Sequence, residues 1–144
     1  MTGKMNNTIL QINDLKTYFF TRLGVVRAVD GVSFGLRKGE CLCLVGESGC
    51  GKTVTALSIL GLIDSPPGKI VDGEIYYENL DLVKCPSERL RHIRGKEVAM
   101  IFQDAQSALN PVFTVGDQIV EQIRLHLGMN GNEAKEKAIG LLEE

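Results

Sequence analysis

One stretch of the sequence combines the residue types that can hold a chain of phosphate groups. It matches the spacing G-x-x-x-x-G-K-S/T and comprises Gly46, Glu47, Ser48, Gly49, Cys50, Gly51, Lys52 and Thr53. Glycines let the backbone curl into a nest whose N–H groups point inward, where phosphate oxygens can accept them. A helix that begins at the loop adds the positive end of its dipole. The spacing therefore predicts a binding site for a nucleoside triphosphate.

Two residues at the end of this loop would do most of its chemistry. Lys52 is placed to reach the β- and γ-phosphates as a point charge, and the Thr53 hydroxyl is placed to coordinate Mg²⁺. The flanking residues fit, because an apolar run at 41–45 precedes the loop and apolar residues at helical spacing follow it over 53–63. The alternative is a glycine-rich turn with a structural role only.

A second stretch, VAMIFQD at 98–104, admits two interpretations. In the first, an apolar strand ends in an acid, and Asp104 holds Mg²⁺ through water, which would suit a P-loop kinase or a small GTPase-like protein. In the second, Gln103 is the functional residue and reaches the metal and the attacking water from the end of the strand. The choice depends on the residues that surround this stretch.

Strands are expected on both sides of the loop and would position it. Alternating apolar residues predict an antiparallel pair at 9–20 and 25–36, joined by a turn at 21–24. The compact apolar run at 41–45 predicts a strand buried on both faces. Further strands are expected at 71–79 and 98–102.

Helices are expected at 53–63, 87–94 and 132–144. A further amphipathic helix would carry Val115, Ile119 and Ile123 on one face, with Thr114 as its N-cap and Asp117 near the positive end of its dipole. The chain stops inside its last helical pattern without a capping signal, so we expect it to be part of a longer protein.

Composition argues against several classes of function. The chain has 144 residues and a formal net charge of −2, which gives no basic footprint for nucleic acid. No apolar stretch approaches the length of about 18 residues that would indicate a membrane span, and the N-terminal residues do not resemble a secretory signal. The balance of apolar and charged residues is that of one globular domain.

The cysteines and histidines do not suggest a metal site. None of Cys41, Cys43, Cys50 and Cys85 belongs to a C-x-x-C pair, which argues against zinc. We expect reduced thiols, with Cys41 and Cys43 in the core on one face of a strand and Cys50 filling space in the loop. His92 and His126 fall in charged helical stretches, so we expect both at the surface.

Three segments together resemble the ABC ATPases: the two leading strands, GESGCGKT at 46–53, and IFQDAQSALNPVFTVGDQIVE at 101–121. In that family IFQD marks the Q-loop, which favours Gln103 as the functional residue. The residues at 107–116 are similar to the subgroup of oligopeptide, dipeptide and nickel importers. The family usually has a proline after the aspartate, where Ala105 and Gln106 stand here. The resemblance covers nearly the whole chain from about Leu10.

The resemblance implies an α/β fold: a P-loop NTPase core of the ABC type, with an antiparallel β subdomain at the N-terminus and the start of a helical subdomain. Residues 1–103 would form the N-terminal part of the nucleotide-binding core, and residues 104–144 the beginning of the helical subdomain. The signature motif, the Walker B strand and the switch histidine would belong to a C-terminal remainder that is absent here. This chain alone would then bind ATP without efficient turnover.

The resemblance also implies roles for single residues. Lys52 and Gln103 would be catalytic, and Gln103 together with Thr53 would hold Mg²⁺. Phe19 would stack on the adenine of ATP, with Tyr18 as the neighbouring candidate, and stacking of this kind contributes about 1–3 kcal/mol. The alternative is that both aromatic residues simply pack in a sheet.

The implied function is that of an ATP-binding, energy-coupling subunit of an ABC importer for oligopeptides or dipeptides, an ATPase that uses Mg²⁺. Its implied partners are a second ABC ATPase subunit, transmembrane permease subunits and, indirectly, an extracellular or periplasmic substrate-binding protein, with no nucleic acid. Its location would be cytoplasmic, peripheral on the inner face of the cell membrane. Two alternatives stay open: an ABC ATPase outside transport, and a truncated nucleotide-binding module without turnover.

Overall fold

The computed structural model describes residues 7–104 and 108–143 of the chain. The described residues form two compact units, which divide between Leu90 and Arg91. Ser107, the first residue of the importer-like run, lies outside the described residues, and so do Ala105 and Gln106, where the sequence departs from the family pattern. Within the described ranges, no helix is both long and apolar enough to cross a bilayer. The expected division into 1–103 and 104–144 stays a prediction.

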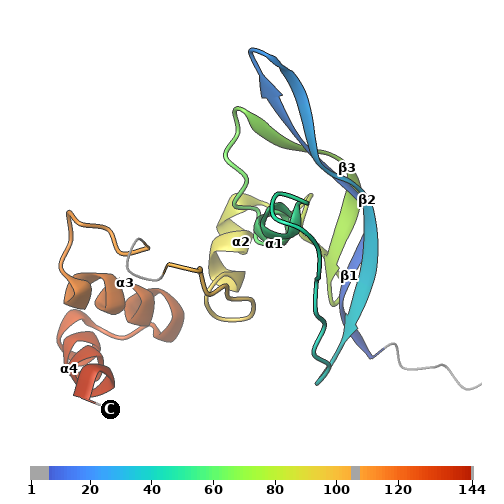
Figure 1. Ribbon diagram of the computed structural model, residues 1–144. Coiled ribbons are helices and arrows are strands. Elements are labelled where there is room, and N and C mark those ends of the chain that lie inside the picture. The colour runs from blue at the N-terminus through green and yellow to red at the C-terminus, as the bar shows by residue number, and fades with distance from the viewer. Residues whose placement is uncertain (1–6, 105–107, 144) are drawn as a thin grey trace, which may run out of the picture. The chain divides into compact units, whose positions relative to one another are not determined.

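The first unit is built on an antiparallel sheet of four strands (Figure 1). The strands are β1 (Thr8–Thr21), β2 (Gly24–Arg37), β3 (Gly68–Tyr77) and β4 (Leu80–Asp81), in the order β2–β1–β3–β4. β1 and β2 form the predicted hairpin, and β1 lies between β2 and β3. The expectation of an antiparallel pair at the N-terminus is confirmed.

A bulge in β1 sets which side chains point to which face of the sheet. From Ile12 to Leu15, β1 advances three residues while β2 advances two, and β3 shows the same offset one residue later. The extra residue is accommodated at Asp14, whose φ is 46°. Ile12, Leu15 and Thr17 are all fully buried as a result, although strict alternation would separate Ile12 from the other two.

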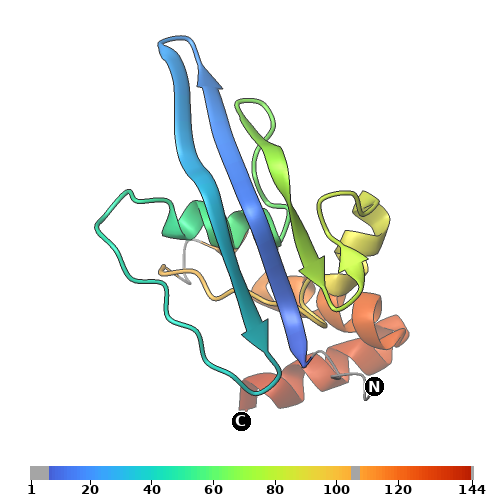
Figure 2. The same cartoon turned by 90° about the vertical axis from the view of Figure 1, so that its right-hand side faces the viewer.

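Helix α1, Lys52–Ile59, lies across one face of this sheet (Figures 1 and 2). The Thr17 hydroxyl of β1 and the Ser58 hydroxyl of α1 are both buried and lie 2.9 Å apart. Ser58 also donates to the Val54 carbonyl at 2.7 Å. The helix is shorter than the predicted 53–63, because the chain turns after Leu60 into Gly61, whose φ is 61°.

Two predicted strands do not form, and these predictions are wrong. Residues 41–45 run as an irregular segment from the end of β2 back toward α1 (Figure 2). Leu42 and Leu44 are exposed there, and so are Cys41 and Cys43, which we expected in the core. Residues 98–102 make only an isolated bridge between Arg94 and Val98. A strand needs a hydrogen-bonded neighbouring strand, and within the described residues neither run pairs with one.

The second unit is helical. Helix α2 (Ser87–Ile93) spans the boundary between the units, and α3 (Val115–Leu127) and α4 (Gly131–Glu143) pack against each other. Their shared core contains the buried side chains Ile123, Ala134 and Ala138. The predicted N-cap is confirmed, because the Thr114 hydroxyl accepts the Asp117 N–H at 3.1 Å.

His126 corrects another expectation. His92 is exposed as predicted, but both ring nitrogens of His126 are buried, with no hydrogen-bond partner among the described residues. A Cβ built on Gly95 would lie 3.2 Å from His126 Nε2. The last turn of α3 therefore packs against the turn at Gly95, a contact between distant residues that helical periodicity does not reveal.

The buried hydroxyl pair that joins α1 to the sheet gives a prediction. Ser58→Ala leaves the Thr17 hydroxyl buried without a partner, so the free energy of unfolding should fall by about 1–3 kcal/mol. Combining it with Thr17→Val removes both hydroxyls and should cost less than the sum of the two single changes. Urea unfolding of the three variants measures this, and strict additivity would contradict the pairing.

Candidate nucleotide-binding site

The predicted phosphate loop ends in a close contact with the sheet. Gly51 has a φ of 92°, and a Cβ at this position would lie 2.2 Å from the Ala28 carbonyl oxygen and 3.5 Å from Val29 Cγ2. The left-handed conformation and the lack of space both require glycine here. The end of the loop therefore contacts β2 directly. This contact fixes the position at which α1 begins.

The N-terminus of α1 is open toward an anion. Gly51 is the N-cap, no side chain caps the helix, and its first turn contains no acidic residue. The Gly51 carbonyl accepts the Thr55 N–H at 2.8 Å and the Thr55 hydroxyl at 2.9 Å, which closes the first turn. The first N–H groups of a helix have no partner within it and carry the positive end of the dipole, so this end of α1 favours a negatively charged group.

The Lys52 ammonium folds back into the loop. Its Nζ donates to the carbonyl oxygens of Gly46 at 2.7 Å and Glu47 at 2.6 Å, and lies 3.4 Å from Cys50 Sγ. These contacts use the three N–H bonds of the ammonium and hold the positive charge where the loop curls. Cys50, expected to fill space, is exposed and takes part in this contact. Thr53 follows on the helix with an exposed side chain.

The two candidate aromatic residues of β1 point to opposite faces of the sheet. Phe19 follows Thr17 by two residues and therefore shares the face that carries α1. Tyr18 points the other way, where its hydroxyl donates to the Asp30 carboxylate at 2.6 Å and the Arg27 guanidinium lies 5.5 Å from its ring centroid. The hydrogen bond to the Asp30 carboxylate raises the pKa of the Tyr18 phenol.

Phe19 also lies near the end of the loop. Its partner on β2 is Val26, two residues from Ala28, on which Gly51 rests. Two residues along a strand span about 6.6 Å, and neighbouring strands lie about 4.8 Å apart. The backbone of Phe19 is thus within about 10 Å of the contact at Gly51, on the same side of the sheet as α1.

Gln103 belongs to the second unit, where its side chain is exposed. Its predicted roles as a metal and water ligand stay predictions, and so does the alternative role of Asp104. Both interpretations assumed a strand at 98–102, and the described residues contain only the bridge at Val98.

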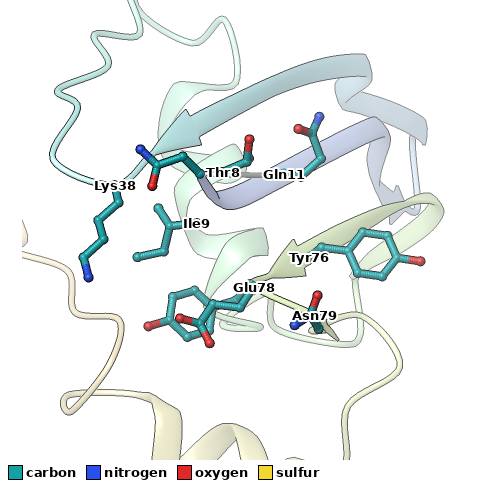
Figure 3. Close-up of a pocket in the computed structure, with 9 residues that line it drawn as sticks. Thr8, Ile9, Gln11, Lys38, Tyr76, Glu78 and Asn79 are labelled. Atoms are coloured by element: carbon teal, nitrogen blue, oxygen red, sulfur yellow. The ribbon is translucent and has the colours of Figure 1, made fainter. Parts of the chain in front are cut away.

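A separate hollow of about 770 Å³ lies at the opposite end of β1 (Figure 3). Thr8 and Gln11 of β1, Tyr76 of β3, and the flanking residues Lys38 and Glu78 line it. No residue of the phosphate loop contributes to this hollow, so it is not part of the predicted site.

Two residues that shape the site were missed in the sequence. The Ala28 carbonyl is the surface on which Gly51 rests, and Gly68 of β3 lies against the ring of Phe19. The motif indicates that the backbone makes a close contact at Gly51, but it does not identify the residue that Gly51 contacts. Gly68 follows two prolines in the sequence, and this composition is typical of a turn. It therefore gives no sign of a contact with Phe19.

Comparisons with known proteins show the family to which this chain belongs. Residues 29–144 match the ABC transporter family. The oligopeptide transport ATP-binding protein AppD of Bacillus subtilis (strain 168) is 49% identical over 137 residues, which are 95% of this chain and 42% of that protein. The dipeptide transport ATP-binding protein DppD of the same organism is 45% identical over 134 residues, 93% of this chain and 40% of that protein.

A solved structure shows the same fold. The ATP-binding cassette MJ0796, described as a dimer in a post-hydrolysis state bound to ADP and Pi, aligns with a TM-score of 0.72 and 23% identity, covering 93% of this chain and 56% of that one. The predicted fold class, an ABC-type core with an antiparallel β subdomain, is confirmed. The chain spans about two fifths of the length of the curated relatives, and it belongs to the ABC transporter family of ATP-binding proteins.

Proposed function

We propose that this chain is the ATP-binding part of an energy-coupling subunit in an ABC importer for oligopeptides or dipeptides. The observation that carries the proposal is the close contact of Gly51 with the Ala28 carbonyl of β2, which we call the seat of Gly51. It fixes Lys52 at the uncapped N-terminus of α1. The names of the relatives support peptide transport, since AppD and DppD are oligopeptide and dipeptide transport ATP-binding proteins.

The loop suits a triphosphate for electrostatic reasons. The α1 N-terminus favours an anion, and the Lys52 ammonium supplies a full positive charge beside it. The left-handed glycines Gly49 and Gly51, with φ of 80° and 92°, let the chain curl around that charge. Hydrogen bonds from the ammonium to ionised phosphate oxygens are stronger than its present bonds to neutral carbonyls, so Lys52 would exchange one set for the other.

Mg²⁺ is the metal that this reaction class uses. The Thr53 hydroxyl is exposed next to Lys52 and has the hard oxygen that Mg²⁺ prefers. Thr53 and Gln103 would hold the ion, and a bound Mg²⁺ neutralises charge that develops on the phosphate oxygens. What the chain's own residues contribute is the fixed position of Lys52 and Thr53, which the seat of Gly51 provides.

The proposed setting follows from the same relatives. The working subunit would pair with a second ATPase subunit and dock on transmembrane permeases at the inner face of the cell membrane, with a substrate-binding protein outside. Uptake of labelled dipeptides and oligopeptides by cells that carry the full subunit tests this role. Uptake that persists unchanged when Lys52→Ala replaces the wild-type subunit would contradict it.

The first prediction here concerns phosphate binding. Lys52→Ala should weaken binding of ATP by about 2–5 kcal/mol, because the charge that faces the phosphates is lost. Lys38→Ala is the matched control, since Lys38 carries the same charge but is exposed and follows the end of β2 that lies away from Ala28. Calorimetric titration with ATP and Mg²⁺ measures both, and a change below about 0.5 kcal/mol for Lys52→Ala would refute the site.

The seat of the loop gives a second prediction. Gly51→Ala adds both left-handed strain and a collision with the Ala28 carbonyl, so the free energy of unfolding should fall by about 2–5 kcal/mol. Gly49→Ala is the control, because its φ is also left-handed but a Cβ there meets nothing within 4 Å. We expect a loss of only about 1–2 kcal/mol from strain alone. Equal losses in urea unfolding would show that the contact with β2 is unimportant.

The third prediction concerns the base. Phe19→Ala should weaken the binding of ATP and GTP alike, between about fivefold and about 150-fold, because stacking tolerates any base. Tyr18→Ala should leave both affinities near wild type, since Tyr18 faces away from α1. The opposite ranking in the same titrations would assign the base to Tyr18.

A further inference from the structure

Gly68, the first residue of β3, lies directly beside Phe19. The two residues are cross-strand partners in the β1–β3 pairing. A Cβ built on Gly68 would lie 2.9 Å from Phe19 Cε1, 2.5 Å from Ile63 Cγ2 and 3.0 Å from the Asp64 carbonyl oxygen. Because these distances are shorter than any ordinary contact of a methyl group, the ring of Phe19 rests against the bare backbone of Gly68.

The backbone around Gly68 has little freedom to move. The Gly68 N–H donates to the Asp64 carbonyl at 2.8 Å, and the Phe20 N–H donates to the Pro67 carbonyl at 2.9 Å. Gly68 itself is buried, and its φ is not left-handed. Glycine is therefore needed at this position for its size and not for its conformation, so an alanine fits the backbone and collides only with its neighbours.

Phe19 lies between two neighbouring strands of the sheet. β1 is the central strand, so Phe19 has Gly68 on β3 at one side and Val26 on β2 at the other. A methyl group on Gly68 would displace the ring from its present position, because it would lie 2.9 Å from Phe19 Cε1. That shift changes the plane that Phe19 offers on the α1 face, while the loop and Lys52 keep their seat on Ala28.

We propose that Gly68 is a positioning residue for nucleotide binding: its missing side chain leaves the space in which Phe19 presents its ring to the base. The inference rests on the proposed function, because it requires that this chain bind a nucleotide with Phe19 against the base. In this proposal Gly68 affects only the binding of the base, and the loop binds the phosphate groups.

Titrations of the full chain with ATP, GTP and inorganic triphosphate test this assignment. Gly68→Ala should weaken ATP and GTP by at least about threefold and by no more than Phe19→Ala does. It should leave the affinity for inorganic triphosphate, which has no base, unchanged. In a Phe19→Ala background, Gly68→Ala should have no further effect on ATP, because no ring is left to displace.

Gly35→Ala is the matched control. Gly35 lies in the same sheet without a left-handed φ, and its Cβ would meet the flexible end of Gln11, with Oε1 at 2.7 Å. If Gly68→Ala does not fold, Ile63→Ala is added to remove the closest collision, at 2.5 Å, while the contact with the Phe19 ring stays. The same three titrations on that double variant then decide, with Ile63→Ala alone as the reference.

The outcomes separate the two proposals. If Phe19→Ala weakens ATP and Gly68→Ala does not, the positioning role is wrong and the proposed function survives. If Gly68→Ala weakens inorganic triphosphate as much as ATP, the effect is a general loss of structure, and the positioning role is again wrong. If the wild-type chain binds neither ATP nor inorganic triphosphate, the proposed function fails and the inference fails with it.

Discussion

The bulge in β1 is the constraint on which the rest of the first unit depends. It needs Gly73 opposite, because a Cβ there would lie 2.5 Å from the Asp14 carbonyl oxygen and 2.6 Å from Leu15 Cα, and because Gly73 has a φ of 93°. Lys16 ties the two sides together, with Nζ 2.8 Å from the Asp14 carboxylate and 3.0 Å from that of Asp72. These hydrogen bonds raise the pKa of Lys16, and the one from Lys16 lowers the pKa of Asp72. The ion pairs of Lys16 thus stabilise the register of β1 that also buries Ile12, Leu15 and Thr17 on the other face.

The bulge also determines which face of the sheet the later residues of β1 point to, up to the candidate site. Because the alternation shifts by one residue, Thr17 faces α1 and can pair with Ser58. Two residues later the same face carries Phe19, while Tyr18 is left on the polar face with Asp30. One inserted residue therefore determines both where α1 is held and which aromatic ring stands on its side of the sheet.

Local signals in the sequence were enough for the start of a helix at Lys52, for the hairpin and for the cap at Thr114, because each is determined by neighbouring residues. The buried strand at 41–45 was predicted from apolar composition alone, and composition does not supply the hydrogen-bonded neighbour that a strand needs. The choice between Phe19 and Tyr18 depends on a bulge that alternation does not reveal. The ring nitrogens of His126 are buried beside Gly95, which is far from it in the sequence. What escaped prediction in each case was a contact between distant parts of the chain.

The loop is preorganised by bonds that are easy to exchange. Lys52 is held by two neutral carbonyls, and a hydrogen bond to a neutral acceptor contributes only about 0.5–1.5 kcal/mol net. The position of the loop does not depend on those bonds, because Gly51 is fixed by its contact with Ala28 and by the first turn of α1. The ammonium is therefore kept at the curl of the loop. In the proposed function it would turn to a stronger, ionised acceptor while the backbone stays in place. A fixed backbone beside a weakly held charge would suit the proposed binding of a phosphate chain, and in this chain the two properties belong to the adjacent residues Gly51 and Lys52.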